Sequence, residues 1–509
     1  MQPSTRKWPG LGERSAMLKR CLFLVMLLAG GGSAQVPQVL PANRPHLRDW
    51  STLVGRDPVL ARGLEAMRQK VRWPRPLPVR FADTGKVNAW YHPGDHSVTV
   101  DYSLYDFLYK TFESDPRYRP QAEAMALRAG RFILLHELAH ALMDELNLPY
   151  TGKNEDCADQ LAVLLADALE GPEGRLDAQA GAQWFLLMGW NKQQDVSKVN
   201  FWDEHSFDLQ RYFNVLIYLE CAHPGSLPNT FQSISPERLE RARRRWPRKL
   251  AAWSHHLQGR ATLWASPRLP PPPPSAAPRR ITMAFEDTAE SDLQMIRSEM
   301  MRHPFAPHLN SFAQIFKLPR DLAVDFVDGR KPVFRYLPEQ HRVVVSYGWV
   351  LDVGKFLGSQ TQDGQTIMSM LGAIMVLELS ERTQQMMLEE LQVPITGEPE
   401  DAAVELLTLA FADNAQVVPL LREAAEYYRW KARANPHMLT YDYSSEDDLH
   451  HQRFLDLYMA LYVARPQQFE WVKSWIPESR LQRAQAEWPR KNQNWERLIL
   501  PYARTQAAP

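Results

Sequence analysis

This chain of 509 residues has a formal net charge of zero, only three cysteines and few long apolar runs. Lys and Arg number 59, and so do Asp and Glu, so no excess of either sign points to nucleic acid or a charged membrane surface as a partner. The N-terminal apolar run, Cys21–Ala29, is too short to span a bilayer as a helix. With 45% hydrophobic and 23% charged residues the composition is that of a globular protein, and the length favours two or more domains.

The N-terminal apolar run has the features of a secretory signal. A Lys-Arg pair precedes it and GGGSA follows it, so Gly32 and Ala34 suit the small-residue positions before a cleavage site. The start of translation could be Met1 or Met17, and no cysteine that would accept a lipid follows the run. We therefore expect residues 1–34 to be a signal peptide. The mature protein would be exported, periplasmic or secreted, without a stable membrane anchor.

Two cysteines remain after the signal segment, Cys157 and Cys221. Export would place them in a compartment that permits a disulfide. The internal repeat described next has Ala402 and Val463 at the matching positions, so both cysteines are absent together from the second copy, as a bonded pair would be. Two buried free thiols are the alternative.

The dominant feature of the sequence is an internal repeat. At an offset of 245 residues Pro149 matches Pro394, and the match extends over a long span without gaps. Further along the offset becomes 242, and the tetrapeptide WPRK at Trp246–Lys249 recurs at Trp488–Lys491. One domain is therefore present twice, in tandem.

A proline-rich segment separates the two copies. Its sequence, SPRLPPPPPSAAPRR, is typical of a semi-rigid polyproline II spacer and marks a domain boundary. We expect a first domain over residues 35–265, a linker over 266–280 and a second domain over 281–509.

Local patterns in the first copy predict a small sheet and long helices. Alternation predicts strands at Asn88–Tyr91 and Ser97–Tyr102, with a turn at His92–His96. One helix is expected from about Gln121 to Leu146, and a second from Asn154 to Leu169. The expected fold class is α+β, mostly helical, with a small antiparallel or mixed sheet in each domain.

The first of these helices carries HELAH, a pattern with metal-binding spacing. His136 and His140 are four residues apart, so both imidazoles leave the same face of the helix, and Glu137 lies beside that face. Catalytic zinc generally has three protein ligands and an open position. Glu155, in the first turn of the next helix, is the natural third ligand. Asp159 is four residues further on, where it could accept a hydrogen bond from a ligand histidine.

HELAH followed by a helix with NExxxD resembles the gluzincin metallopeptidases, the thermolysin-like group. The series NAWYHP, HELAHALMDELNLPYTGKNEDCADQLA and DEHSFDLQRYFNVL is more closely similar to a bacterial metallopeptidase family of this type, over about residues 75–255 and in degraded form over about 318–500. The resemblance implies two zincin-like domains, zinc held by the two histidines and Glu155, and Glu137 as general base. The interval between His140 and Glu155 is shorter than in thermolysin itself.

The same resemblance implies roles outside the two helices. NAWY is similar to the edge strand with which these enzymes hold an extended peptide, which would make Asn88, Ala89 and Trp90 substrate-binding residues. His205 would stabilise the oxyanion of the tetrahedral intermediate, as a histidine does in thermolysin-like enzymes. A solvent-facing histidine at a helix start is the alternative for His205.

The second copy keeps the hydrophobic frame and loses the ligands. The replacements, in chain order, are His136 by Glu381, Glu137 by Arg382, His140 by Gln385, Asp159 by Val404 and His205 by Asp447, whereas Glu155 keeps its carboxylate as Glu400. We expect one zinc ion per chain, in the first domain only. The second domain should fold without catalysis and could pack on the first, cover its cleft or hold a partner. Arg211 and Arg453 are present in both copies and suit a structural ion pair.

Three functions remain open at this point. The first is an exported zinc metallopeptidase acting on a peptide or protein; the second is a non-catalytic binding or scaffold protein with a structural metal. The third is a zinc amidase acting on cell-wall peptides, which would share the site and differ in substrate. The peptidase is favoured because a closed structural site needs a fourth protein ligand, and within the helix pair the sequence offers no further His or Cys except Cys157.

Overall fold

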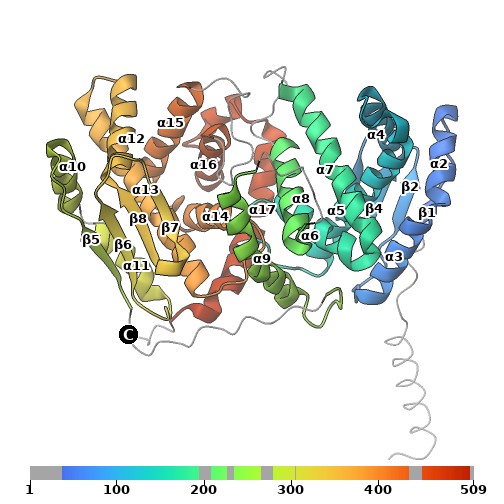
Figure 1. The fold of residues 1–509 in the computed structure, drawn as a ribbon, viewed down its shortest axis with the longest axis horizontal. Coiled ribbons are helices and arrows are strands. Elements are labelled where there is room, and N and C mark those ends of the chain that lie inside the picture. Colours follow the sequence, from blue (N-terminus) through green and yellow to red (C-terminus); the bar gives the residue numbers. More distant parts are fainter. Residues whose placement is uncertain are drawn as a thin grey trace, which may run out of the picture.

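The computed structural model describes residues 37–193, 208–225, 234–264, 279–303, 305–434 and 450–504. It has two halves that lie side by side, each with one small sheet and many helices. The two sheets are at opposite ends of the molecule and helices fill the space between them (Figure 1). The expected α+β class and the two domain-like repeats are confirmed.

The elements of the first half follow the expected order of a small sheet and then helices. Its strands are β1 (Gln38–Val39), β2 (Val79–Ala82), β3 (Ala89–His92) and β4 (Ser97–Asp101). Its helices are α2 (Arg48–Gly55), α3 (Pro58–Lys70), α4 (Tyr102–Ser114), α5 (Ala122–Glu145), α6 (Asn154–Glu170), α7 (Pro172–Gln193), α8 (Asp208–Ala222) and α9 (Pro236–Leu257).

The second half repeats this arrangement. Its strands are β5 (Ile281–Phe285), β6 (Leu322–Val327), β7 (Phe334–Leu337) and β8 (Arg342–Ser346). Its helices are α10 (Ser291–Arg302), α11 (Phe305–Ile315), α12 (Tyr347–Gln360), α13 (Gly364–Glu390), α14 (Pro399–Phe411), α15 (Val418–Ala434), α16 (His450–Ala464) and α17 (Glu478–Ile499).

Each sheet has four strands and is mixed. The order is β1-β2-β4-β3 in the first half and β5-β6-β8-β7 in the second. The first three strands of each sheet run parallel, and the last, at the edge, is antiparallel to its neighbour. All five residues of β4 are buried, including Val98 and Val100 on one face and Ser97 and Thr99 on the other, as suits an interior strand covered on both faces. This places β3, which carries the NAWY motif, at a free edge.

The turn between α5 and α6 brings the two helices together. Asn147 ends α5 with a positive φ of 45°, and the amide of Leu148 donates to the carbonyl of Met143 at 2.9 Å, which is a Schellman-type helix end. The second half has the same turn, with Gln392 at a φ of 54°. A left-handed residue followed by a proline turns the chain back, so the start of α6 lies against α5.

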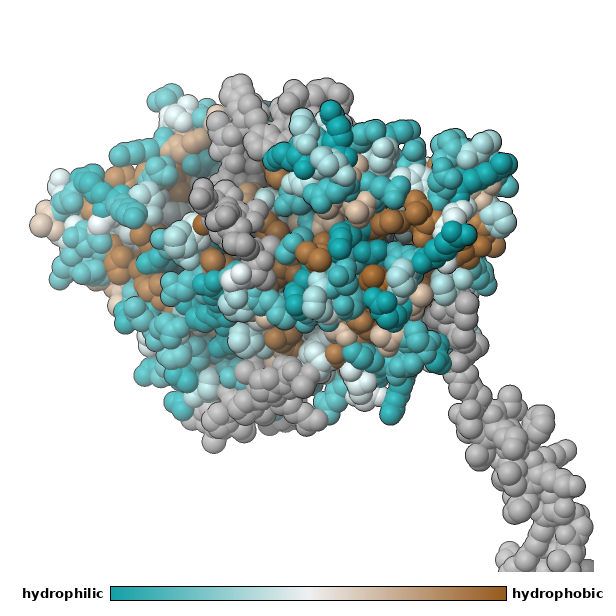
Figure 2. Space-filling view, turned by 45° about the vertical axis from the view of Figure 1, so that its right-hand side comes forward, coloured by the Kyte–Doolittle hydropathy of each residue, from teal (hydrophilic) through white to brown (hydrophobic). Residues whose placement is uncertain are grey.

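Helix α5 is the centre of the first half. Its hydrophobic residues are buried along its length, because α4, α6 and α7 all pack against it and the sheet covers part of its surface. The face drawn in Figure 2 is mostly hydrophilic, with hydrophobic residues in small patches. No helix in the described part of the chain is both long and apolar enough to cross a membrane.

The two halves contact each other through their last long helices. Helix α9 of the first half reaches the second half, where Arg248 binds Glu389 at 3.0 Å and the ring of His256 bonds the carbonyl of Pro394 at 3.0 Å. Helix α17 of the second half makes the matching contact in return, with Arg490 on Asp144 at 2.7 Å. Because Arg490 and Asp144 are the repeat counterparts of Arg248 and Glu389, the packing is reciprocal.

Candidate metal centre

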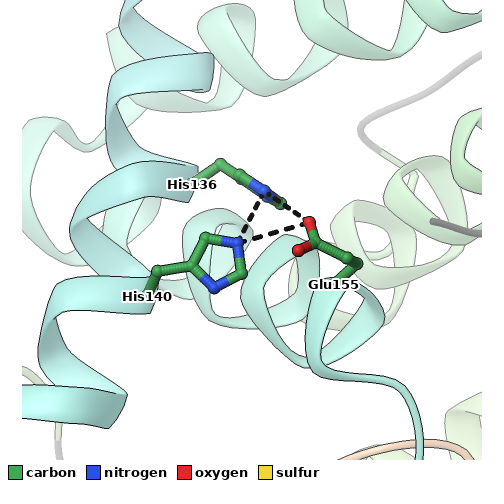
Figure 3. A group of neighbouring side chains, drawn as sticks. All are labelled: His136, His140 and Glu155. Carbon is green, nitrogen blue, oxygen red and sulfur yellow. Dashed lines mark hydrogen bonds and ion pairs between the residues drawn. The ribbon is translucent and has the colours of Figure 1, made fainter. Parts of the chain in front are cut away.

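Three side chains of the first half converge between α5 and α6. The Nε2 atoms of His136 and His140 lie 3.1 Å apart, and they are 3.1 and 3.3 Å from one carboxylate oxygen of Glu155 (Figure 3). Two ligand atoms that each lie about 2.1 Å from one tetrahedral ion are about 3.4 Å apart. Two imidazole nitrogens and a carboxylate oxygen at these distances therefore fit a zinc ion.

Helix geometry produces this convergence. His136 and His140 are one turn apart on α5, so their rings project from the same face, and the first turn of α6 brings Glu155 opposite them. His136 and Glu155 are buried, while His140 is partly exposed. Among the described residues, this is the one group of three such side chains whose atoms are close enough to hold an ion.

Asp159 fixes the orientation of His136. Its carboxylate lies 2.8 Å from Nδ1 of His136 and also receives two hydrogen bonds from the guanidinium of Arg211, at 2.7 and 2.8 Å. A proton on Nδ1 of His136 then donates to Asp159, which leaves the lone pair on Nε2 facing Glu155 and His140. Arg211 in turn lies over the ring of Phe185, 4.1 Å from its centroid.

The charges in this group act on one another strongly. Burial lowers the pKa of His136, but its contacts with Asp159 and Glu155 outweigh burial and raise that pKa to about 9. Burial would raise the pKa of Asp159, whereas Arg211 and His136 hold it well below its usual range. Without an ion the pocket thus favours a positive charge, which is what a metal cation would bring.

Glu137 faces the edge strand of the sheet. One of its carboxylate oxygens accepts a hydrogen bond from the backbone amide of Tyr91 in β3, at 2.8 Å. The amide of Asp101 donates to the carbonyl of Asn88. Because only alternate residues of an antiparallel pair exchange hydrogen bonds, the backbone groups of Asn88 and Trp90 point toward β4. The backbone groups of Ala89 and Tyr91 therefore point to the free edge, on the side where Glu137 lies.

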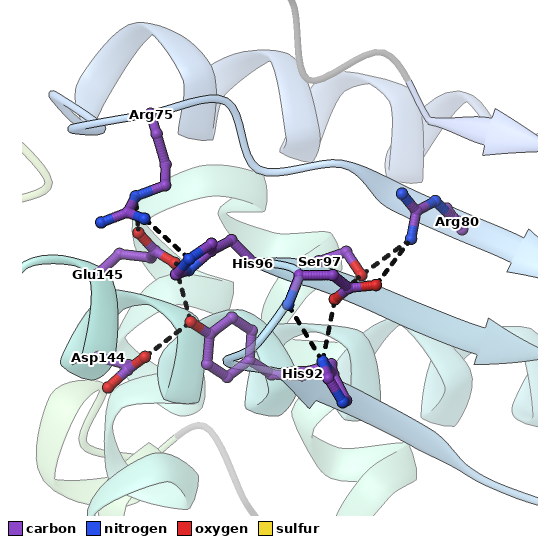
Figure 4. A network of polar contacts seen from close by, with 9 residues as sticks. Arg75, Arg80, His92, His96, Ser97, Asp144 and Glu145 are labelled. Carbon is purple, nitrogen blue, oxygen red and sulfur yellow. Dashed lines mark hydrogen bonds and ion pairs between the residues drawn. The ribbon is translucent and has the colours of Figure 1, made fainter.

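The hairpin that carries this edge is anchored to the end of α5 (Figure 4). The hydroxyl of Tyr91 donates to Asp144 at 2.8 Å and to Glu145 at 2.9 Å. Glu145 also binds His96 at 2.6 Å and Arg75 at 3.0 Å. The second half keeps the corresponding contacts of Tyr336, His341 and Arg320 with Glu390. This network therefore belongs to the frame that both halves share.

In the second half the corresponding position is filled by protein. Nε2 of Gln385 donates to Glu400 at 3.0 Å, and Arg245, which comes from α9 of the first half, donates to the same carboxylate oxygen at 2.9 Å. Arg453, the counterpart of Arg211, bonds Glu381 directly. The second half has Val404 in place of Asp159 and Glu381 in place of His136. Arg453 therefore still has a buried carboxylate as its partner.

The other predicted site residues are placed as follows. Asn88 is exposed just before β3, Ala89 is buried within the strand, and Trp90 is partly exposed with Lys86 over its ring. His205 lies outside the described residues, as do residues 1–34, which were expected to be a signal peptide. The structural ion pair expected for Arg211 and Arg453 is observed in both halves, but its place behind His136 and the reach of Arg245 into the other half were not predicted. The recurrence of Arg211 was a signal for the ion pair, but nothing in the motifs marked Arg245.

Of the two alternatives for the cysteines, the disulfide is not observed. Cys157 and Cys221 are both free thiols. Cys157 is buried, and its sulfur donates to the carbonyl of Thr151 at 3.3 Å and lies 3.5 Å from the hydroxyl of Thr396. Their joint absence from the second copy therefore reflects local packing and not a bond.

The sequence was compared with protein families, curated proteins and solved structures. It matches the family described as "Putative metallopeptidase" twice, over residues 40–257 and again over 285–499. No curated protein and no solved structure matches the chain. The family match covers most of the chain and both halves, and the triad of ligand-type side chains lies in the first of them. The chain therefore belongs to this metallopeptidase family.

Proposed function

We propose that the protein is an exported zinc-dependent peptidase whose active site lies in the first half. The observation that carries the proposal is the convergence of His136, His140 and Glu155 beside both Glu137 and the free edge of β3. A carboxylate next to three metal ligands, facing a strand that can pair with an extended peptide, is the arrangement that peptide hydrolysis needs. Export rests on the sequence of residues 1–34 alone.

The residues have separable roles in this proposal. Zinc, when bound, would polarise the scissile carbonyl and make the attacking water more acidic. Glu137 accepts the proton of that water and passes it to the leaving amine. The edge of β3 holds the substrate backbone extended, and Asp159 keeps His136 in the orientation for binding. His205 is proposed as the donor that stabilises the oxyanion, on the basis of the family resemblance.

The ligand set favours catalysis over a structural metal. A closed structural zinc site has four protein ligands. Among the described residues, no fourth His, Cys, Asp or Glu joins the triad, and the thiol of Cys157 is engaged with Thr151 and Thr396. Three protein ligands leave a position for water and substrate. A zinc amidase would use the same groups, so substrate alone separates it from a peptidase.

Metal analysis combined with two variants tests the proposal. Purified protein should contain one zinc per chain, and His140→Ala should contain none. Glu137→Gln should keep the zinc and lose hydrolysis of a mixed peptide library, because the amide cannot accept the proton. Gln385→Ala, at the counterpart of His140 in the second half, is the matched control and should keep both.

Different outcomes would point to the alternatives. Two zinc ions per chain would contradict a second half without metal. If the zinc-loaded Glu137→Gln variant hydrolyses peptides as fast as the unchanged protein, Glu137 is not the general base. The binding or scaffold function would then be preferred. Cleavage confined to amide bonds of cell-wall peptides would favour the amidase.

A further inference from the structure

A cavity of about 120 Å³ lies where the two halves meet, away from the metal ligands. It is partly open and is formed by the start of α6 from the first half and by α14, α16 and α17 from the second, which lie close together near the centre of the molecule (Figure 1). Its apolar wall includes Met459, Ala460, Val463, Ala484 and Trp488. No role in metal binding or in peptide hydrolysis has been given to it above.

The first half has the repeat counterpart of this cavity, and there it is closed. The space that remains is about 20 Å³. Tyr218 occupies it, stacked on Trp246 with ring centroids 5.9 Å apart, and its hydroxyl donates to Glu398 at 2.7 Å. At the position of Tyr218 the second half has Ala460. The larger cavity therefore results from the absence of one tyrosine side chain.

Two charged side chains that line the cavity in the second half, Arg480 and Glu487, form no direct ion pair within the described residues. Arg480 is 92% buried, since its exposed fraction is 8%, and its Nε and Nη1 atoms have no hydrogen-bond partner in the described structure. Its counterpart Arg238 is bonded to Asn214 at 2.7 Å. Burial of a guanidinium without a partner is costly, so Arg480 requires an anionic or carbonyl group in the cavity.

Glu487 is the second such group. It lines the same cavity, and within the described residues it forms no hydrogen bond or ion pair. Its counterpart Arg245 is bonded to Glu400. The other charged residues of the wall all have interactions of their own: Lys153, Asp401, Glu405, Asp456 and Lys491. The guanidinium of Arg480 thus has unbonded nitrogens, while the carboxylate of Glu487 forms no hydrogen bond in the described part of the chain, although Lys491 and Tyr150 interact with it electrostatically.

We propose that this cavity binds a small zwitterion, a free α-amino acid with a short side chain, with its carboxylate at Arg480 and its ammonium group at Glu487. Arg480 and Glu487 are seven residues apart on α17, which is about 10 Å along the axis and on the same side of the helix. A zwitterion with a hydrogen bond at each end spans a comparable distance. The volume would hold roughly four water molecules, which is the size of glycine or alanine.

The charges of the wall favour a zwitterion over a simple anion. A carboxylate alone would satisfy Arg480 but would lie near Glu487, and a cation alone would lie near Arg480. An α-amino acid satisfies both groups in one molecule, and its short side chain can occupy the space that Tyr218 fills in the other half. The site is independent of the proposed peptidase activity, because none of its residues is a metal ligand or the general base.

Calorimetric titration of the full-length protein with L-alanine tests this inference. We expect saturable binding at one site per chain. Glycinamide lacks the carboxylate and acetate lacks the ammonium group, so each should bind at least tenfold more weakly than L-alanine. Arg480→Gln and Glu487→Gln should each weaken L-alanine binding by at least tenfold. If the unchanged protein shows no saturable binding at L-alanine concentrations up to about 50 mM, the proposal is overturned.

The first half supplies a matched control. Ala460→Tyr restores the residue that closes the counterpart cavity and should abolish binding of L-alanine without changing the zinc content. If this variant does not fold, the comparison of L-alanine with glycinamide and acetate still decides the matter in the unchanged protein. Equal binding of L-alanine by the unchanged protein and by a folded Ala460→Tyr would place the amino acid elsewhere and refute the site.

Discussion

Arg245 of the first half and Glu400 of the second half form a buried ion pair with a distance of 2.9 Å, and Glu400 is the repeat counterpart of Glu155, the proposed metal ligand. Burial would raise the pKa of Glu400, but Arg245 and Arg382 lower it to about 2, so the carboxylate is charged. A guanidinium from the neighbouring half thus provides the positive charge that a metal ion would bring in the first half. At the position that corresponds to the candidate metal centre, the second half thus has a contact between the two halves.

This contact predicts that Arg245 stabilises the folded chain. Arg245→Met should lower the free energy of unfolding by about 3 kcal/mol, because Glu400 would remain buried and charged without its main partner. The double variant Arg245→Met with Glu400→Gln should regain much of that loss, since the unpaired charge is then gone. Urea unfolding followed by tryptophan fluorescence measures both, and a double variant less stable than the single one would contradict this account.

Arg248 offers a control on the same helix. It binds Glu389 across the interface at 3.0 Å, but 44% of its side chain is exposed. Arg248→Met should therefore change the stability by less than about 1 kcal/mol. Neither Arg245→Met nor Arg248→Met should alter the zinc content, because both arginines contact carboxylates of the second half and not the triad of the first.

Local patterns in the sequence predicted the elements that hold the site. The helix expected from about Gln121 to Leu146 is observed as Ala122–Glu145, and the next helix begins at Asn154 as expected. These predictions succeed because helical periodicity, the turn residues and a Pro that follows are all local signals. The spacing of His136 and His140 and the first-turn position of Glu155 depend on the same signals, so the triad could also be predicted.

Contacts between distant segments could not be predicted in this way. Arg245 is a helix residue among several basic residues, and nothing in its neighbourhood distinguishes the one that enters the other half. The two-residue β1 and the parallel pairing of β2 with β4 have no local signature either. The disulfide could not be decided for a related reason, because joint absence from a repeat cannot distinguish a bond from two separate packing positions.

Asp159 and Arg211 should tune the affinity for zinc. Arg211 holds Asp159 with two hydrogen bonds, and Asp159 holds Nδ1 of His136. Asp159→Asn and Arg211→Gln should each weaken zinc binding about 10- to 100-fold, because His136 would lose its fixed orientation and some basicity. Competition of the protein with a fluorescent zinc chelator measures the change.

Arg453 provides the matched control for this prediction. It occupies the position of Arg211 in the second half and bonds Glu381 in place of an aspartate. Arg453→Gln should lower the stability of the chain but leave the zinc affinity unchanged. An equal loss of zinc affinity in Arg453→Gln and Arg211→Gln would mean that the effect arises from general destabilisation.

His256 should make the interface sensitive to acid. Burial lowers the pKa of its ring to about 3, an effect to which His255 and Arg497 add, although the contact with the carbonyl of Pro394 opposes it. The unfolded chain, with a pKa near 6.5, takes up the proton first. The stability that neutral His256 contributes is therefore present above about pH 6.5 and decreases as the pH falls toward 3.

The size of this effect can be measured with a variant that has no titratable ring at this position. Between pH 7 and pH 5 the contribution of His256 should fall by about 2 kcal/mol. His256→Gln keeps a donor for the carbonyl of Pro394 and has no proton to gain. Its free energy of unfolding should change by about 2 kcal/mol less over that interval than that of the unchanged protein. Identical pH dependence in the two proteins would show that His256 does not titrate differently on folding.

The edge of β3 should bind the substrate through its backbone. The amide of Tyr91 is used by Glu137 and Ala89 is only 4% exposed, so a peptide that pairs with this edge must reach the backbone groups of Ala89 and the carbonyl of Tyr91. In a peptide that is cleaved, methylation of the one amide nitrogen that pairs with Ala89 should lower kcat/KM by about 2- to 13-fold, which corresponds to the loss of one hydrogen bond. A scan of singly N-methylated versions of the same peptide locates that position. If every methylated position away from the scissile bond is cleaved at the original rate, β3 does not hold the substrate, and Asn88, Ala89 and Trp90 lose their assigned role.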